Sequence, residues 1–173
     1  MTLSLYEATI PSYRQIVAAV TALVTKAAAH CAERNEPDAV LIEARLTPKM
    51  LPFGYQVKAV SEHSRGAIEA VRAKVFSPGP AKWPSSFARL AELLRETDDF
   101  LAGLERAEVD NFVGRDARFE FQERRQDFTA EDFLLSYAQP NFYFHAATAY
   151  DILRVQGLPI GKRDFIGSPR VKG

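Results

Sequence analysis

Four long segments of the chain carry apolar side chains every three or four residues, and this spacing constrains the fold more than any other feature. Such spacing is typical of α-helices that bury one face. The segments run from about 12 to 33, 52 to 75, 86 to 105 and 129 to 156. The connections between them are longer than the loops of a minimal hairpin bundle. We therefore expect an all-α, up-down four-helix bundle with at least one crossover connection.

Prolines and glycines indicate where these helices begin and end. Pro11 suits the first turn of the first helix, because a proline at that place loses no backbone hydrogen bond. The run Ser77-Pro78-Gly79-Pro80 ends the second helix. Gly157 and Pro159 end the fourth helix, since glycine favours the turn after a helix and proline cannot continue it.

The helical spacing fails between Val109 and Gln126, ahead of the fourth segment. Apolar and polar residues alternate in Arg118-Phe119-Glu120-Phe121-Gln122, as they do in a half-buried strand. A second short strand that ends at Phe128 would complete a small β-hairpin before the last long helix. Two strands alone are only marginally stable, so we expect this hairpin to pack on the helices.

Length, charge and cysteine content exclude several classes of protein. The 173 residues suffice for one domain, which we expect to span residues 1–173. Lys and Arg together number 22, and so do Asp and Glu, which gives no net charge to attract nucleic acid or an anionic membrane. A lone Cys31 excludes an intramolecular disulfide and is typical of a reducing cytosol.

Targeting signals are not expected either. Residues 1–5 carry no basic region followed by an apolar run, as a signal peptide would. No apolar stretch reaches the ~20 residues that a membrane span requires. We therefore expect a cytoplasmic protein that has neither nucleic acid nor membrane as a partner.

Two polar residues on the apolar face of the fourth segment mark the candidate site. Asn141 and His145 are four residues apart, which places them on one helix face beside Thr148. An unpaired polar group in a core is costly, so each side chain needs a partner. His145 is either a ligand or acid–base group in an interhelical pocket, or a neutral core histidine bonded to Gln56, Asn141 or a buried water. Asn141 could instead compensate the backbone carbonyl that Pro140 leaves free.

Other polar and aromatic residues complete the candidate surfaces. Gln56 lies on the apolar stripe of the second segment, whereas His63 lies at its edge, where we expect a surface role. Tyr143 points away from the core by the helical spacing, and tyrosine is enriched at subunit interfaces, so we expect a homodimer. The tail from Gly161 to Gly167 carries Phe165 among mixed charges and is expected to dock on the bundle or on a second subunit.

Four stretches of the sequence together resemble an uncharacterised bacterial domain family. They are Ser4-Leu5-Tyr6 with Pro11, Glu43-Ala44-Arg45-Leu46 before Pro48 and Met50, Pro140-Asn141-Phe142-Tyr143-Phe144-His145, and Gly161-Lys162-Arg163-Asp164-Phe165-Ile166-Gly167. That family is grouped with the DinB/YfiT-like four-helix bundles, a superfamily of proposed metalloenzymes. The resemblance covers nearly the whole chain. Its motifs are specific for the family but not for any activity.

The resemblance implies a metal site, which this sequence alters. The wider superfamily often binds a divalent metal through three histidines, one on the second helix and a His-x-x-x-His pair on the fourth. Here the matching positions are Gln56, Asn141 and His145, so one histidine remains. Neutral amides are poor ligands for zinc or nickel beside imidazole. These three residues are our predicted ligand-binding set, in which His145 is the one candidate ligand for a divalent transition metal.

Two functions follow from this set. The first is a small-molecule-binding bundle or a degenerate metal-dependent enzyme, of the thiol-dependent transferase kind that the resemblance implies. The second is a non-catalytic, dimeric structural or interaction protein in which Gln56, Asn141 and His145 form only a core hydrogen-bond network. The sequence does not decide between them, and it assigns no catalytic residue.

Overall fold

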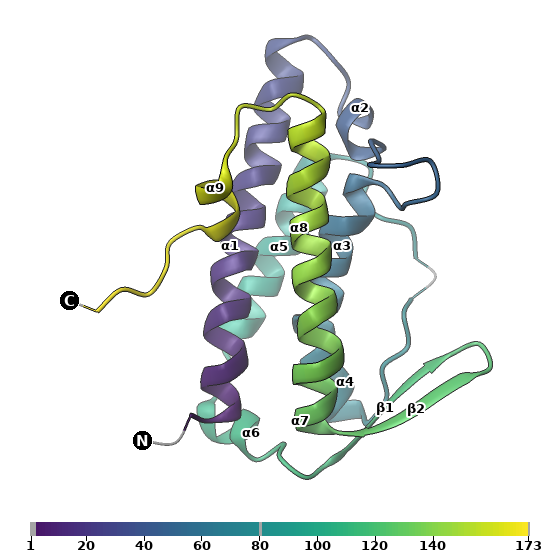
Figure 1. Ribbon diagram of the computed structural model, residues 1–173, viewed down its shortest axis with the longest axis vertical. Helices are drawn as coiled ribbons and strands as arrows, with labels where there is room; N and C mark the ends of the chain where they lie inside the picture. Colours follow the sequence, from purple (N-terminus) through teal and green to yellow (C-terminus); the bar gives the residue numbers. More distant parts are fainter. Residues whose placement is uncertain (1–2, 80, 173) are drawn as a thin grey trace.

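Four long helical columns form the bundle that the sequence predicts. The computed structural model describes residues 3–79 and 81–172. The columns are α1 (Leu5–Glu33), α3 (Phe53–Glu62) continued by α4 (Arg65–Ala73), α5 (Phe87–Ala102) and α8 (Gln139–Val155) (Figure 1). Both α1 and α3 pack against α5 and α8. Shorter helices at the ends and side are α2 (Ala39–Ile42), α6 (Arg106–Asp110), α7 (Ala130–Asp132) and α9 (Lys162–Ile166).

A crossover connects α4 to α5, as expected. α3 and α5 are neighbours that run in the same direction, opposite to α1 and α8 (Figure 1), so the chain must return along the bundle before α5 begins. Pro80, part of the predicted stop in this connection, lies outside the described residues. Trp83 anchors the connection, because its Nε1 donates to Glu43 Oε1 at 2.8 Å. A Cβ atom on Gly54 would lie 2.5 Å from Trp83 Cδ1, so the indole packs closely only on glycine.

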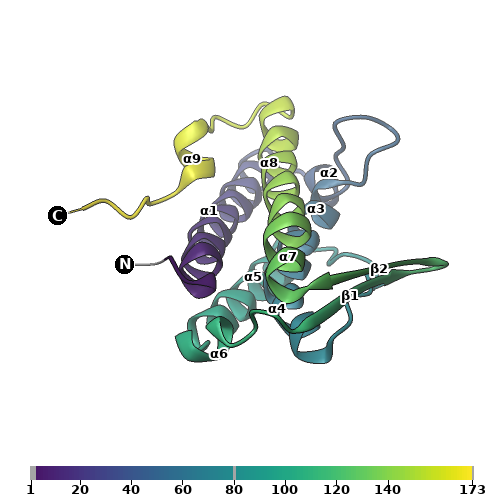
Figure 2. The ribbon, with the colours of Figure 1, turned by 60° about the horizontal axis from the view of Figure 1, so that its bottom comes forward.

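The β-hairpin lies between α6 and α7, where the alternating pattern predicts it. β1 (Asp116–Phe121) pairs antiparallel with β2 (Arg124–Thr129). Phe119 and Phe128 contact the ring of Tyr137, at centroid distances of 5.1 and 6.0 Å. The hairpin therefore packs on the bundle at its base, while its outer part extends away from the helices (Figure 2).

The first helix begins earlier than predicted. α1 starts at Leu5 and contains Pro11, which the sequence analysis placed at the helix start. Ser4 explains the difference, because its Oγ accepts from Glu7 N while Glu7 Oε2 accepts from Ser4 N. This capping box secures the first turn, so the helix tolerates the backbone hydrogen bond that Pro11 lacks one turn later.

The expectation that no apolar stretch is long enough to span a membrane also requires a correction. By length and composition alone α1 could cross a membrane, whereas the sequence analysis found no such stretch. A core helix of a bundle and a membrane span share these features, so composition does not distinguish them. In the bundle, the buried stripe of α1 includes Ile10, Tyr13, Val17, Val20, Leu23, Val24 and Ala27.

The second long segment is two helices, so the prediction of one helix from 52 to 75 was wrong. α3 ends at Glu62 and α4 begins at Arg65, with Ser64 at φ −116° and ψ −81° between them. The Ser64 hydroxyl donates to Val60 O at 2.7 Å. A side-chain bond of this kind competes with the backbone ladder, which accounts for the break directly after His63.

The fourth long segment contains a π-helical stretch just before Pro140. Phe133–Ala138 is π-helical between α7 and α8, and Pro140 follows in the first turn of α8. Proline has no backbone N–H, so Pro140 cannot donate to Ser136 O as another residue would in a regular α-helix. A π-turn shifts the pairing by one residue, so that each carbonyl accepts from the N–H five residues later. The ribbon stays continuous through this point (Figure 1), so the π-turn absorbs the proline without a sharp bend.

The C-terminal tail docks on the bundle, one of the two places predicted for it. α9 packs against α1 and α8. Asp164 secures the tail, because its carboxylate accepts from Gly161 N and from Lys26 Nζ on α1. Gly167 has φ 67°, and a Cβ atom there would lie 3.2 Å from Ala19 Cβ. Glycine therefore allows the tail to approach α1 closely.

Candidate functional site between α3 and α8

The side chains of His145 on α8 and Gln56 on α3 meet between the two helices. His145 Nδ1 lies 2.7 Å from Gln56 Oε1. The exposed fraction is 9% for His145 and 2% for Gln56, so water has little access to this bond. The sequence places both residues on apolar helix faces, and the packing of α3 on α8 brings those faces together. Two of the three predicted site residues are therefore in direct contact.

The hydrogen bonds of Gln56 fix the position of the proton on His145. Gln56 Nε2 donates to Leu51 O at 2.8 Å, which turns Oε1 toward His145. Because Oε1 can only accept, the proton of the shared bond belongs to His145 Nδ1. A neutral imidazole then carries its lone pair on Nε2. Gln56 thus positions His145 as a hydrogen-bond acceptor at Nε2.

His63 also belongs to this site, although the sequence analysis assigned it to the surface. Its ring stacks on the ring of His145, with centroids 5.3 Å apart and planes inclined by 13°. Only 8% of His63 is exposed, and its Nδ1 has no hydrogen-bond partner among the described residues. We call His63 and His145 the imidazole pair.

The burial of His63 depends on residues far away in the sequence. The rings of Phe76 and Tyr137 cover it, at centroid distances of 5.4 and 6.0 Å. Phe76 belongs to the crossover, so a helical projection of the second segment alone does not reveal this burial. One feature of the sequence indicated this burial. His63 follows Gln56 by seven residues, or two helical turns, which places both on the same side of a helix.

Burial keeps both imidazoles neutral. It lowers the pKa of His63 to about 3, and the proximity of His145 adds to that shift. Burial likewise lowers the pKa of His145 to about 4. The physical cause is that the charged form loses its hydration in apolar surroundings. At neutral pH the imidazole pair therefore offers nitrogen lone pairs and no positive charge.

Asn141, the third predicted residue, is bonded elsewhere. It is half-buried, and its Nδ2 donates to Tyr137 O at 2.7 Å. Tyr137 lies in the π-helical stretch just before Pro140, where the backbone ladder is irregular. The sequence suggested that this amide compensates the carbonyl that Pro140 leaves free, which in a regular α-helix is Ser136 O. The acceptor is instead the carbonyl of the next residue, Tyr137. In the described part of the chain, Asn141 makes no hydrogen bond to the other two predicted residues.

Aromatic rings enclose the imidazole pair. Tyr55 and Phe144 both meet the ring of His145 edge-on, at centroid distances of 5.8 and 5.2 Å. Burial raises the pKa of the Tyr55 hydroxyl, and it raises the pKa of Tyr137 to about 12. Both hydroxyls therefore keep their protons at neutral pH and remain potential hydrogen-bond donors.

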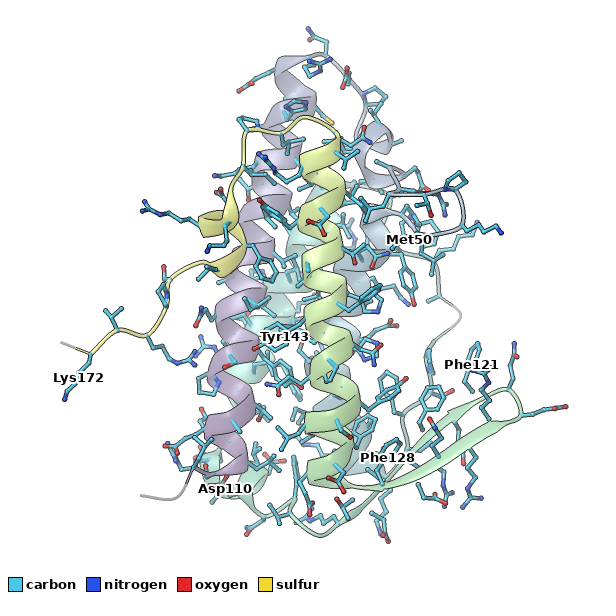
Figure 3. All side chains as sticks on the ribbon, in the orientation of Figure 1. Met50, Asp110, Phe121, Phe128, Tyr143 and Lys172 are labelled. Atoms are coloured by element: carbon cyan, nitrogen blue, oxygen red, sulfur yellow. The ribbon has the colours of Figure 1, made fainter. Side chains whose placement is uncertain are left out.

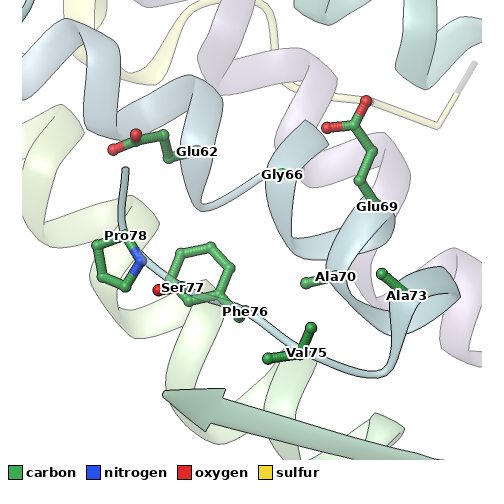
Figure 4. Close-up of a pocket in the computed structure, with 9 residues that line it drawn as sticks. All are labelled: Glu62, Gly66, Glu69, Ala70, Ala73, Val75, Phe76, Ser77 and Pro78. Carbon is green, nitrogen blue, oxygen red and sulfur yellow. The ribbon is translucent and has the colours of Figure 1, made fainter. Parts of the chain in front are cut away.

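A hollow of about 280 Å³ opens between α4 and the crossover (Figure 4), and neither His63 nor His145 lines it. Phe76, which covers one imidazole, also lines this hollow. Two carboxylates reach it, but Glu62 already pairs with Lys58 at 2.6 Å and Glu69 with Arg65 at 3.0 Å. The hollow therefore presents carboxylates whose charges are already balanced.

The residues present do not fit the three-histidine metal site that the resemblance implies. Both polar atoms of Gln56 are engaged, and the Asn141 amide donates to a backbone carbonyl. Within residues 3–79 and 81–172, no group of three or more His, Cys, Asp or Glu side chains is placed to hold a metal. Protein sites for zinc and similar metals supply at least three ligands. His145 Nε2 alone does not meet this requirement, so we derive no chemistry through a metal.

Comparison with known proteins agrees with this fold. The family model described as "Domain of unknown function (DUF1993)" matches residues 5–166. The chain belongs to the DUF1993 family. The DUF1993 chain is similar to the crystal structure of a DinB family member from Shewanella denitrificans, solved at 1.83 Å resolution, with a TM-score of 0.83. The two are 24% identical, and the match covers 98% of this chain and 95% of that one.

The comparisons establish a fold rather than an activity. No curated protein matches this DUF1993 chain. The similarity to the DinB family member, at 24% identity, confirms the DinB-like bundle that the resemblance implied. The chemistry of this DUF1993 protein must therefore be inferred from its own side chains, of which Gln56, His63 and His145 are the ones brought together.

Proposed function

We propose that this protein binds a small molecule at the imidazole pair, with His145 Nε2 accepting a hydrogen bond from the ligand. The observation that carries the proposal is the Gln56–His145 bond, which fixes an Nε2 lone pair in a buried site. The neighbouring Nδ1 of His63, without a partner among the described residues, supports a ligand as well. Buried polar atoms in proteins almost always have a partner, and a ligand would supply it.

The chemistry of the site favours a ligand that donates hydrogen bonds over an anion. Both imidazoles are neutral at pH 7, so neither attracts negative charge. The buried Lys58 is already paired with Glu62. Apolar walls come from the rings of Tyr55 and Phe76. A molecule with an O–H or N–H group on an apolar body matches these surroundings.

If the ligand reacts, His145 Nε2 is the atom placed to accept its proton. A general base must lie within hydrogen-bond reach of the proton that it takes, and a fixed lone pair meets this condition. Gln56 would then be a positioning residue that acts through His145. A metal-dependent, thiol-transferase-like reaction is not part of this proposal, because the amide side chains at the other two positions are engaged within the chain.

Histidine-selective ¹⁵N NMR tests the proposal. We expect His145 to carry its proton on Nδ1, and primary alcohols, phenols and alkylamines, used as probes, to shift its Nε2 resonance. Gln56→Leu should weaken probe binding by at least about tenfold, because the imidazole is no longer held in one tautomer. The proposal fails if none of the probes shifts His145, or if calorimetry shows that the probes bind His145→Phe, which lacks this resonance, with unchanged affinity.

Measuring and adding metal distinguishes this proposal from a metal-dependent function at the altered site. Protein purified without a chelator or a metal-affinity tag should contain less than about a tenth of an equivalent of zinc, nickel or manganese. Adding these ions should leave the unfolding temperature unchanged. Stoichiometric metal, together with loss of that metal in His145→Phe, would restore the metal-dependent function.

A second candidate function is a non-catalytic, dimeric structural or interaction protein. The observation that favours it is the outer face of α8, where Tyr143 is 37% and Phe144 is 55% exposed. Aromatic side chains of this kind are enriched at subunit interfaces. The Gln56–His145 bond would then only satisfy buried groups, and His145→Ala would destabilise the fold by about 1–3 kcal/mol through the orphaned amide oxygen.

Native mass spectrometry distinguishes the two candidates. A small molecule that co-purifies with the wild type, but not with His145→Phe, counts against the purely structural function. Both proposals place the protein in the cytoplasm, which the lone Cys31 favours. Both give it neither nucleic acid nor membrane as a partner, because its 22 basic and 22 acidic residues balance.

A further inference from the structure

The outer edge of strand β2 has no partner strand among the described residues. Most of β2 is exposed, and only Phe128 is half-buried. The opposite edge of the hairpin is occupied, because Phe76 N donates to Arg118 O and Phe76 O accepts from Glu120 N. A strand edge with unpaired backbone groups pairs readily with another chain. Among the described residues, β2 therefore presents the edge that a partner can use.

The bonds to Phe76 also show which backbone groups of β2 point outward. Phe119 lies between the two β1 residues that bond to Phe76, so its own N–H and C=O face β2. Gln126 is opposite Phe119 and therefore points its backbone groups back to β1. The neighbouring residues Arg125 and Asp127 point theirs to the free edge. A partner strand would form its hydrogen bonds with these two residues.

The side chains along β2 are complementary to themselves. When two copies of β2 pair antiparallel about a twofold axis at Gln126, Arg125 of each copy lies opposite Asp127 of the other. Both residues are at hydrogen-bonding positions, so the backbone pattern and the charge pattern agree. Opposite charges on facing residues stabilise a sheet, and like charges destabilise it. An axis at Arg125 would place arginine opposite arginine, and an axis at Asp127 would place aspartate opposite aspartate.

Charges on β1 extend the same pattern. Within one chain, Arg118 Nε bonds to Asp127 Oδ1 at 2.6 Å, and Glu120 lies opposite Arg125. In the paired arrangement, one row of side chains crosses four strands. It contains Arg118 on β1 and Asp127 on β2 of one copy, and then Arg125 on β2 and Glu120 on β1 of the second copy. The sign of the charge alternates at every step of this row. The twofold axis produces the same row a second time.

The hairpin is accessible to a second copy. Its outer part extends away from the bundle (Figure 2), and Figure 3 places Phe121 far along the hairpin from Phe128 at the base. Phe121 is 43% exposed in this chain. A two-stranded hairpin is marginal on its own, and pairing would give it four strands. The strands are only six residues long, so the interface is smaller than the ~1,600 Å² of a standard complex, and we expect weak association.

We propose that two copies of this chain pair through their β2 strands, antiparallel and centred on Gln126. The partner is a second copy because the charge order of β2 matches itself in one register. This inference rests on the dimer of the second candidate function, but it assigns the contact to β2 instead of the outer face of α8. It is independent of whether the imidazole pair binds a small molecule.

Sedimentation velocity of the full chain between about 5 and 500 µM tests the pairing. We expect the wild type to dimerise with rising concentration. Arg125→Asp and Asp127→Arg should each weaken self-association by at least about tenfold, because like charges then face each other twice. An equimolar mixture of the two variants should recover a heterodimer, since every substituted position then faces the opposite charge.

Further variants keep the test decisive. Each charge reversal also places like charges inside its own hairpin, so Arg125→Pro provides a second route. Proline there removes an N–H that points to the free edge, which edge strands tolerate. Cross-strand NMR contacts between Phe119 and Gln126 verify that the hairpin remains paired. Arg95→Asp on α5 is the matched control, because it reverses an exposed charge away from β2.

Two results would overturn the inference. One is a wild type that stays monomeric up to about 500 µM. The other is a dimer that persists in all the β2 variants but is lost in Phe144→Ser, which would assign the interface to α8. Because probe binding at His145 is measured separately, failure of the pairing and failure of the ligand proposal give different results.

Discussion

Helix α8 contributes to two buried regions that are stabilised in different ways. Phe142 enters an apolar region against α1, where its ring meets Tyr13 edge-on at a centroid distance of 4.7 Å. His145, three residues later, enters the site against α3 and bonds to Gln56. Burial is similar in the two regions, but the first depends on contact between apolar surfaces and the second on paired polar atoms. The two regions should therefore respond differently to truncation, to pH and to loss of a partner.

The comparison also separates a region built for stability from one suited to a ligand. Apolar packing gains free energy in proportion to the surface removed from water, whatever the protonation state of the chain. The imidazole pair instead holds two neutral bases in surroundings that oppose their charged form. Such a site costs stability when its nitrogens are unpaired, which supports a role for it beyond packing.

Truncation in the apolar region should have the largest effect. Phe142→Ala removes a fully buried ring, and we expect the free energy of unfolding to fall by about 3–5 kcal/mol through lost burial and the cavity left behind. Urea denaturation at pH 7 measures this loss in the free energy of unfolding. Phe144→Ala is the matched control, because that ring is 55% exposed and should cost less than about 1.5 kcal/mol. Equal losses in the two variants would show that Phe142 does not anchor the core.

Acidification should act on the imidazole pair. Histidine in the unfolded chain has a pKa near 6.5, whereas burial lowers it to about 3 for His63 and about 4 for His145. Below pH 6.5 the unfolded chain therefore binds more protons than the folded chain, so stability present above that pH is lost as the pH falls. Between pH 7 and 5 the loss should be about 2 kcal/mol per histidine.

The contribution of His63 to this loss can be isolated. In His63→Phe, denaturation with urea at several values between pH 7 and 5 should show about half the wild-type loss of stability. Paired carboxylates such as Glu108 contribute little above pH 5. The bond from Arg72 lowers the pKa of Glu108 in the folded chain, so its stabilising effect is lost mainly below the ordinary value of 4.5 that it has in the unfolded chain. An unchanged pH dependence in the variant would mean that His63 is charged or solvated in the folded protein.

Loss of the positioning residue should have an intermediate effect. Gln56→Leu leaves His145 Nδ1–H and Leu51 O without partners, and we expect the free energy of unfolding to fall by about 1–3 kcal/mol. Chemical denaturation at pH 7 measures the change. Gln156→Leu makes the same exchange at an exposed position and should stay within about 0.5 kcal/mol of the wild type. A neutral Gln56→Leu would indicate that another group or a water satisfies the imidazole.

The sequence predicts the bundle and part of the site because those features are local. Helical spacing located the columns, alternation located the hairpin, and the apolar faces of Gln56 and His145 indicated that they would meet. The break at Ser64 was missed because it depends on one side-chain bond to Val60 O that competes with the helix. The capping of α1 by Ser4 and Glu7 was readable in the sequence, but Pro11 was the stronger signal.

The remaining differences arise from contacts between distant segments. His63 is buried because Phe76 of the crossover and Tyr137 of the π-helical stretch before α8 lie against it. No property of the second segment alone encodes this burial. Asn141 was grouped with His145 because of their four-residue spacing. The π-turn before Pro140 instead offers Asn141 a carbonyl on its own helix. The four-residue spacing therefore predicted the helix face of Asn141 but not its hydrogen-bond partner.

The smallest expected effect lies in the apolar region, and it has the opposite sign. The Tyr13 hydroxyl is fully buried and has no hydrogen-bond partner among the described residues, and burial raises its pKa. Removing it in Tyr13→Phe should raise the free energy of unfolding by about 1 kcal/mol, since the desolvation cost of an unpaired hydroxyl disappears while the ring remains. Tyr150→Phe, at a half-buried position, is the control and should change little. Destabilisation by Tyr13→Phe would mean that a buried water pairs with the hydroxyl, in which case both buried regions of α8 depend on polar partners and the contrast between them would not hold.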